Sequence, residues 1–130
     1  MTRIPVRWRD LDPLGHVNSA VFLTFFETGR DLWLREVLGE SFGAEQYVLV
    51  RVEVDFRAEV PQGTDYVKST HEVETIGRSS ITLHERLADP ADVTVAEARV
   101  VLVMWDPDRH GSRPVTDVER EALAAPAITA

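Results

Sequence analysis

Two carboxylates, Asp10 and Asp12, stand on a predicted turn that leads directly into the most apolar helical pattern of the chain. Asn18 and Ser19 end the turn, and both are residue types that favour the start of a helix. The first N–H groups of a helix have no partner within it and carry a partial positive charge. Such groups can stabilise an oxyanion while a nearby carboxylate acts as a base or a nucleophile. The stretch therefore predicts a catalytic site.

The two aspartates also have other interpretations. One of them could simply cap the turn. Phosphatases that form an aspartyl phosphate also use Asp-x-Asp, but they need a buried parallel strand and a longer α/β chain, which the sequence does not predict. A divalent metal site needs more carboxylates than this loop supplies. The chain has no cysteine, and His71, His84 and His110 lack metal-ligand spacing, so we predict no metal site.

The elements that must position this stretch follow from hydrophobic periodicity. A helix is predicted from Asn18 or Ser19 to about Leu38, where Gly39 favours its end. Strands are predicted over residues 3–9, 47–60, 65–76, 80–87 and 93–105, and a short polar helix over 115–124. Strands joined by short turns pair antiparallel. The sequence thus predicts an α+β domain in which one long helix packs against a curved antiparallel sheet of about five strands.

Composition limits the function further. With 130 residues, 44% of them hydrophobic, the chain (residues 1–130) is expected to form a single domain. A net charge of −8 argues against nucleic acid or an anionic membrane as partner. The longest apolar run, Val100 to Trp105, is too short to span a bilayer. The N-terminus has no apolar signal-type segment, and the absence of cysteine fits a reducing compartment, so we expect a cytoplasmic protein.

The turn and the helix after it carry a family resemblance. They read Asp10-x-Asp12-Pro13-x-Gly15-His16-Val17-Asn18, then Phe25-Phe26-Glu27-x-x-Arg30. This pattern resembles the signature of hotdog-fold acyl-CoA thioesterases, in particular the 4-hydroxybenzoyl-CoA thioesterase-like subgroup. Two later stretches resemble the second and third sheet strands of that family, Phe56-Arg57-Ala58-Glu59-Val60 and Ile76-Gly77-Arg78-Ser79-Ser80-Ile81. The resemblance covers roughly residues 3–106 and implies the hotdog fold.

The resemblance implies roles for the residues around the turn. Asp12 would be the catalytic carboxylate, and the backbone N–H of Ser19 would polarise the thioester carbonyl. Gly15 would let the loop pass close to the thioester. His16 is either a general acid or base, or a residue that orders the Asp12 turn, which is the interpretation we favour. Asn18 would cap the helix beside the substrate.

The resemblance also implies where the rest of the substrate binds. Arg78, Ser79 and Ser80 would hold part of the pantetheine and nucleotide, often from the partner subunit, so we expect a homodimer or homotetramer. At Phe22 relatives commonly carry tyrosine, so loss of the hydroxyl suggests a more apolar acyl pocket. We interpret Glu27 as structural, because the motif of the subgroup with a catalytic helix carboxylate is not matched.

The predicted function is hydrolysis of an acyl-CoA thioester to the free acid and CoA, without a bound cofactor. The alternative is a non-catalytic protein of the same fold that binds acyl-CoA or acyl carrier protein. Asp12 favours the enzyme, because a pure binding protein has no use for a carboxylate beside a thioester. A third interpretation, an enoyl-thioester hydratase, usually pairs Asp with His in a motif that we do not find.

Overall fold

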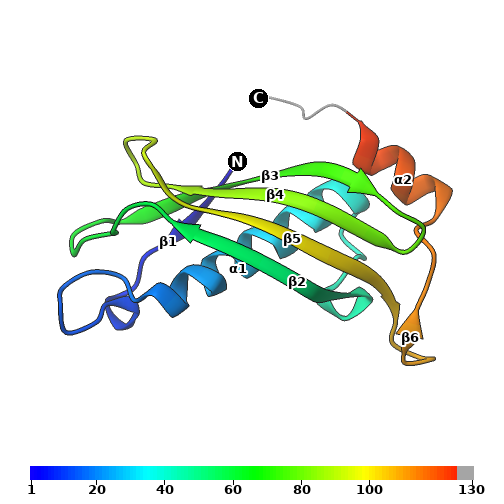
Figure 1. Cartoon of the computed structure of the whole chain (residues 1–130), viewed down its shortest axis with the longest axis horizontal. Coiled ribbons are helices and arrows are strands. Elements are labelled where there is room, and N and C mark those ends of the chain that lie inside the picture. Colours follow the sequence, from blue (N-terminus) through cyan, green and yellow to red (C-terminus); the bar gives the residue numbers. More distant parts are fainter. Residues whose placement is uncertain (126–130) are drawn as a thin grey trace.

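A computed structural model describes residues 1–125, in which an antiparallel sheet curls around one long helix (Figure 1). The elements follow one another in the order β1 (Thr2–Pro5), the 3₁₀ helix η1 (Trp8–Asp10), α1 (Ser19–Leu38), the 3₁₀ helix η2 (Ala44–Gln46), β2 (Tyr47–Phe56), β3 (Tyr66–Ile76), β4 (Ser80–Ala88), β5 (Thr94–Asp106), β6 (Gly111–Ser112) and α2 (Asp117–Ala124). The predicted α+β hotdog architecture is therefore confirmed.

The sheet has the strand order β1-β3-β4-β5-β2, with β6 paired to β5. All pairs are antiparallel. The first strand is short: it pairs with β3 from Thr2, opposite Ser69, to Pro5, opposite Tyr66. β2 and β1 are the two edges. β5 is an interior strand, as its apolar character on both faces predicts, and it runs between β4 and β2.

The core lies between α1 and the concave face of the sheet. α1 contributes its apolar face, and the interior strands contribute alternate residues that point toward the helix. The largest fully buried core side chains include Phe26 and Leu34 of α1, Ile81, Leu83 and Leu87 of β4, and Val95, Val100, Leu102 and Met104 of β5. Burial of these side chains fixes the helix on the sheet, and with it the position of the helix N-terminus.

Most predicted boundaries agree with the structure to within a few residues, but the first strand does not. The alternation over residues 3–9 predicts one strand with Ile4, Val6 and Trp8 on the same side. β1 instead ends at Pro5, and the chain turns into η1 at Trp8, which is 86% exposed. The reason is local: the Asp10 carboxylate accepts a hydrogen bond from the backbone N–H of Arg7, and this bond competes with strand pairing.

Candidate active site

The loop between β1 and α1 is bound to the segment that follows β2. The Val17 N–H donates to the Val60 carbonyl at 2.8 Å, and the Gln62 N–H donates to the Gly15 carbonyl at 2.8 Å. These bonds join the loop to the far edge of the sheet. The loop that carries both aspartates is thus held at two points rather than left free.

Asp10 is a structural part of this loop. Its carboxylate accepts from the Arg7 N–H at 2.8 Å and from the Arg7 guanidinium Nη2 at 3.1 Å, and only 3% of the residue is exposed. Its carbonyl accepts from the Asn18 N–H at 3.1 Å. Asp10 therefore links η1 to the start of α1.

Asp12 has a different environment. One carboxylate oxygen, Oδ1, accepts from the Leu14 N–H at 2.9 Å, and Oδ2 lies 3.5 Å from His16 Nδ1. The backbone closes the turn around it, since the Gly15 N–H donates to the Asp12 carbonyl at 3.0 Å and Gly15 has a φ of 82°. A positive φ of this kind favours glycine. Asp12 is half-buried and lies against His16, whereas Asp10 is buried against Arg7.

The start of α1 has the geometry that the sequence predicts. Asn18 is the N-cap, and its side-chain oxygen accepts from the Ala20 N–H at 2.9 Å. Ser19 is the first helical residue and is exposed. The N–H of a first helical residue has no acceptor within its own helix. It can therefore donate to an external oxygen, with the helix dipole adding to the attraction for negative charge.

A small open cavity of about 280 Å³ lies beside this helix end. The residues that line it are His16, Val17, Ser19 and Phe22 on one side and Phe56, Arg57, Ala58 and Glu59 on the other. The rings of Phe22 and Phe56 lie 5.5 Å apart and form the aromatic part of the lining. Asp12 is outside this lining and meets the cavity through His16. The second wall, at the end of β2, was not predicted as part of a site.

The other predicted binding residues lie elsewhere in the chain. Arg78 and Ser79 form the turn before β4, and the Ser79 carbonyl accepts from the Met104 N–H at 2.8 Å, near the end of β5. The Asp12 loop lies near the opposite end of β5, where the Arg57 N–H donates to the Val95 carbonyl. Nine residues of strand separate these two points, which is roughly 30 Å. Figure 1 shows the two loops at opposite ends of the sheet. One chain therefore does not bring Asp12 and Arg78 together.

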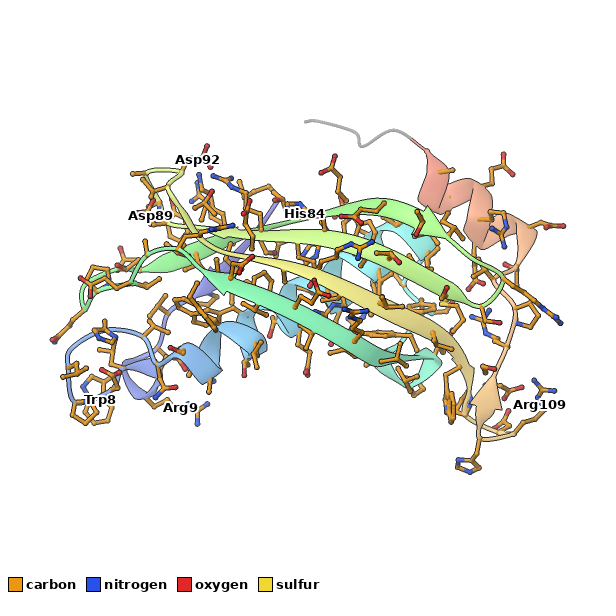
Figure 2. The ribbon with its side chains drawn as sticks, in the orientation of Figure 1. Trp8, Arg9, His84, Asp89, Asp92 and Arg109 are labelled. Atoms are coloured by element: carbon orange, nitrogen blue, oxygen red, sulfur yellow. The ribbon has the colours of Figure 1, made fainter. Side chains whose placement is uncertain are left out.

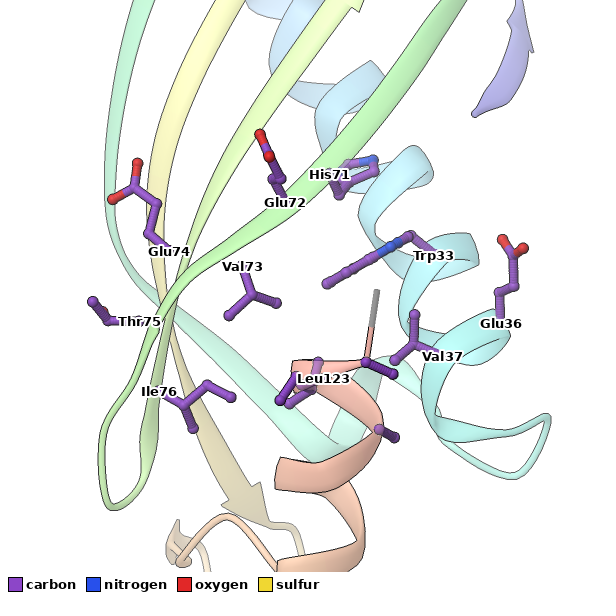
Figure 3. Close-up of a pocket in the computed structure, with 13 residues that line it drawn as sticks. Trp33, Glu36, Val37, His71, Glu72, Val73, Glu74, Thr75, Ile76 and Leu123 are labelled. Atoms are coloured by element: carbon purple, nitrogen blue, oxygen red, sulfur yellow. The ribbon is translucent and has the colours of Figure 1, made fainter. Parts of the chain in front are cut away.

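A larger groove of about 800 Å³ lies between the second half of β3, the C-terminal half of α1 and α2. Figure 3 shows Trp33, Val73 and Leu123 directed into it, while Glu74 points away. None of the predicted site residues lines this groove.

Behind the groove lies a buried charged cluster to which the sequence analysis gave no role. Arg30 of α1 donates two hydrogen bonds to Glu85 of β4, and His71 Nδ1 lies 2.8 Å from Glu85 Oε2. Burial alone would raise the pKa of the Glu85 carboxyl, but the bonds from His71 and Arg30 outweigh this and lower that pKa. Burial opposes the charge of Arg30, yet its bonds to Glu85 raise the Arg30 pKa. The sequence does contain a signal for this cluster: alternation places the charged Glu85 on the same inward side of the strand as Leu83 and Leu87.

Two further properties concern the part of the chain that the structure describes. Within residues 1–125, no group of three or more His, Cys, Asp or Glu side chains is arranged to hold a metal ion. Neither described helix is long and apolar enough to cross a bilayer.

Comparison with known proteins gives one family. The model of the thioesterase-like superfamily matches residues 6–125. A search among curated protein sequences found no match. Among solved structures, a thioesterase from Thermus thermophilus in complex with coenzyme A and Zn is 32% identical, with a TM-score of 0.79 over 94% of this chain and 89% of that one. A predicted thioesterase from Bacillus stearothermophilus is 28% identical, with a TM-score of 0.83 over 94% of this chain and 91% of that one.

Proposed function

Because this chain belongs to the thioesterase-like superfamily, we propose that it hydrolyses an acyl-CoA thioester to the free acid and CoA. The observation that carries the proposal is the arrangement at the start of α1, where the Asp12 turn, the N–H of the exposed Ser19 and a cavity lined in part by Phe22 and Phe56 adjoin one another. The coenzyme A bound to the similar Thermus thermophilus protein supports CoA as the leaving part of the substrate.

The chemistry assigns separate tasks to the carboxylate and the helix. The Ser19 N–H donates to the thioester oxygen and stabilises the negative charge that develops there. Asp12 either takes a proton from water as the water oxygen attacks the carbonyl carbon, or attacks that carbon itself to form a mixed anhydride that water then hydrolyses. In both routes the C–S bond breaks, and the CoA thiolate leaves and takes up a proton. His16 orders the Asp12 turn, and Gly15 keeps its backbone close to the thioester.

The acyl group fits the cavity beside Phe22 and Phe56. Phe22 is 3% exposed, and its ring packs against both Phe25 and Phe56. The two phenylalanine rings offer no hydroxyl to a polar acyl group, so we assign this part of the cavity an apolar acyl chain. Asn18 caps the helix at the rim of the same site.

A second copy of the chain would complete the site. β2 is an edge strand that exposes four apolar side chains, those of Leu49, Val50, Val52 and Phe56. Antiparallel pairing of β2 with its own copy would bring the start of the partner's β2 beside Phe56. Ser79 of the partner subunit would then lie three strand spacings away, about 14 Å, rather than roughly 30 Å. We therefore propose a homodimer, or a homotetramer built from it, in which Arg78, Ser79 and Ser80 of the partner subunit hold part of the pantetheine and nucleotide.

The acidic charge and the absence of cysteine support a cytoplasmic enzyme with a small-molecule substrate rather than nucleic acid or membrane.

The test is to compare Asp12→Asn with the matched variant Asp10→Asn in a thiol-release assay over acyl-CoAs of different length. Asp12→Asn should lower kcat by about 10²–10⁴-fold, because it removes the charge and keeps the shape. Binding of a substrate analogue should survive. Asp10→Asn should cost mainly thermal stability. Turnover by Asp12→Asn within a few-fold of wild type would refute the assignment, and the absence of turnover with any thioester would favour the non-catalytic binding protein.

A further inference from the structure

Trp8 is the most exposed large hydrophobic side chain on the described surface, at 86%. It stands in η1, four residues before Asp12, so its Cα lies at most about 14 Å from that of Asp12. Tryptophan is enriched at binding interfaces, because it offers a large apolar face together with a polar N–H group. Figure 2 shows Trp8 and Arg9 projecting from the same lower side of the molecule, next to the start of α1.

The turn that presents Trp8 is held firmly. Arg7 and Asp10 flank Trp8 and Arg9, and the buried Asp10 carboxylate accepts hydrogen bonds from both the backbone N–H and the guanidinium of Arg7. The Leu11 N–H closes the turn by donating to the Trp8 carbonyl at 3.2 Å. Because the backbone is already ordered, a ligand that packs on the indole would not have to order it. Such preorganisation favours binding.

Arg9 adds a positive charge beside the indole. Residues 1–9 contain three arginines and no acidic residue. Arg7 is paired with Asp10, and the Arg3 guanidinium lies 4.5 Å over the ring of Tyr66. Within residues 1–125, no ion pair or hydrogen bond engages the exposed Arg9 side chain. A flat aromatic face next to a free guanidinium matches a planar base that carries phosphate.

We infer that Trp8 and Arg9 bind the 3′-phosphorylated ADP part of coenzyme A, with the indole stacked on the adenine and the guanidinium paired with a phosphate. This inference rests on the proposed function for its choice of nucleotide. The pantetheine arm would run from this surface to the Asp12 turn. The site would therefore select an acyl-CoA over the same acyl group on pantetheine alone, which lacks the nucleotide.

Two other occupants fit less well. A second copy of the chain would pair through β2, and Trp8 lies outside that strand, in the segment after β1. An acyl carrier protein would need a wider basic surface than Arg9 alone provides, because Arg3 and Arg7 already have partners.

The primary experiment needs no turnover. Adenosine 3′,5′-bisphosphate, which lacks the pantetheine and the thioester, is titrated calorimetrically into the full-length protein at low salt. Trp8→Ala and Arg9→Ala should each raise its Kd about tenfold, within the range for loss of one base–aromatic stack or one charge-assisted bond. Trp8→Phe keeps an aromatic face and should lose less. Arg35→Ala removes an exposed arginine from the last turn of α1 and serves as the charge-matched control, with a Kd within about twofold of wild type.

A second measurement compares kcat/KM for an acyl-CoA and for the matching acyl-pantetheine, which lacks the nucleotide. The ratio of the two should fall about tenfold in Trp8→Ala and Arg9→Ala. A purely structural role for Trp8 would lower both values together and leave the ratio in place, which would overturn the inference.

The remaining outcomes are equally decisive. Equal bisphosphate Kd values in wild type and Trp8→Ala would overturn the inference, as would dissociation of an oligomer by Trp8→Ala in sedimentation, because that would make a second copy the occupant. A carrier-protein substrate that depends on Trp8 while the bisphosphate does not would also overturn it. If no thioester is hydrolysed but the bisphosphate Kd still depends on Trp8 and Arg9, the proposed function fails and the nucleotide site stands.

Discussion

The guanidinium of Arg30 and the carboxylate of Glu85 meet in a two-pronged pair beneath α1, with Nε 2.9 Å from Oε2 and Nη2 2.6 Å from Oε1. Arg30 is 3% exposed and Glu85 is 0% exposed, so water screens neither charge. Fifty-five residues of chain separate the two side chains. The pair therefore ties the middle of the helix to the middle of the sheet, and the position of the helix determines where the Ser19 N–H points.

Replacing only one partner of this pair should destabilise the fold more, per substitution, than replacing both. Arg30→Met or Glu85→Gln alone leaves a buried group without its partner, and each should lower the free energy of unfolding by about 3–5 kcal/mol. The double variant should lose clearly less than the sum, because no unpaired charge remains. Urea unfolding of the four proteins measures this coupling. Strictly additive losses would mean that the two charges do not stabilise each other.

Glu85 should also make the fold sensitive to acid. Its pKa in the folded protein is lowered, so its contribution to stability is full above the unfolded-state pKa of about 4.3 and is lost as pH falls through the folded-state value. The difference in unfolding free energy between wild type and Glu85→Gln should thus be largest near neutral pH and shrink below about pH 4. Glu72→Gln, an exposed change on β3, is the control and should give a difference that is small at every pH. A difference for Glu85→Gln that stays constant from neutral pH into the acid range would contradict this origin.

The helix was predictable because its signals are local. Asn18 caps it, Gly39 ends it at a φ of 107°, and the apolar pattern between them is continuous. The pairs β3–β4 and β4–β5 follow from the short turns between these strands, which make them run antiparallel. The same rule is wrong for β2, which does not pair with β3 across the turn after it but with β5, where it forms an edge of the sheet.

The parts that were missed depend on contacts that periodicity does not encode. The alternation of residues 3–9 was real, but the Asp10 side chain turns the chain at Arg7 and so exposes Trp8. His71 was given no role because it lacks metal-ligand spacing, whereas its partner is Glu85 on the neighbouring strand. The wall formed by Phe56–Glu59 joins the site only because the loop after β1 crosses to the other edge of the sheet.

The exposed edge of β2 gives a prediction for assembly. Val52 lies near the middle of the strand and is 41% exposed, so Val52→Lys would place a charge at the centre of the proposed subunit contact. Sedimentation should then show a shift toward the monomer, and hydrolysis of acyl-CoA should fall with it, because Arg78 of the partner subunit is lost. Val118→Lys, on the 78% exposed side chain of α2, is the control that should leave the oligomer intact. An oligomer of unchanged size in Val52→Lys would remove β2 from the interface.

Gly29 gives the last prediction, because the usual effect of its substitution should be reversed. Replacing glycine by alanine inside a helix normally stabilises by roughly 0.5–1 kcal/mol. Here an added Cβ would lie 2.3 Å from Ser69 Oγ, 2.8 Å from Ser69 Cβ and 2.9 Å from His71 Nε2. Ser69 is 1% exposed and cannot move into water, so the helix itself must shift away from β3. Gly29→Ala should therefore destabilise by about 1–3 kcal/mol, as overpacking does, and lower the Tm.

The control is Ser69→Gly, which removes two of the three contacts. In this background Gly29→Ala should cost much less stability, so the double variant Gly29→Ala/Ser69→Gly should be nearly as stable as Ser69→Gly alone. A higher Tm for Gly29→Ala, or equal losses from Gly29→Ala with and without Ser69, would show that contact with Ser69 does not set the distance between α1 and β3.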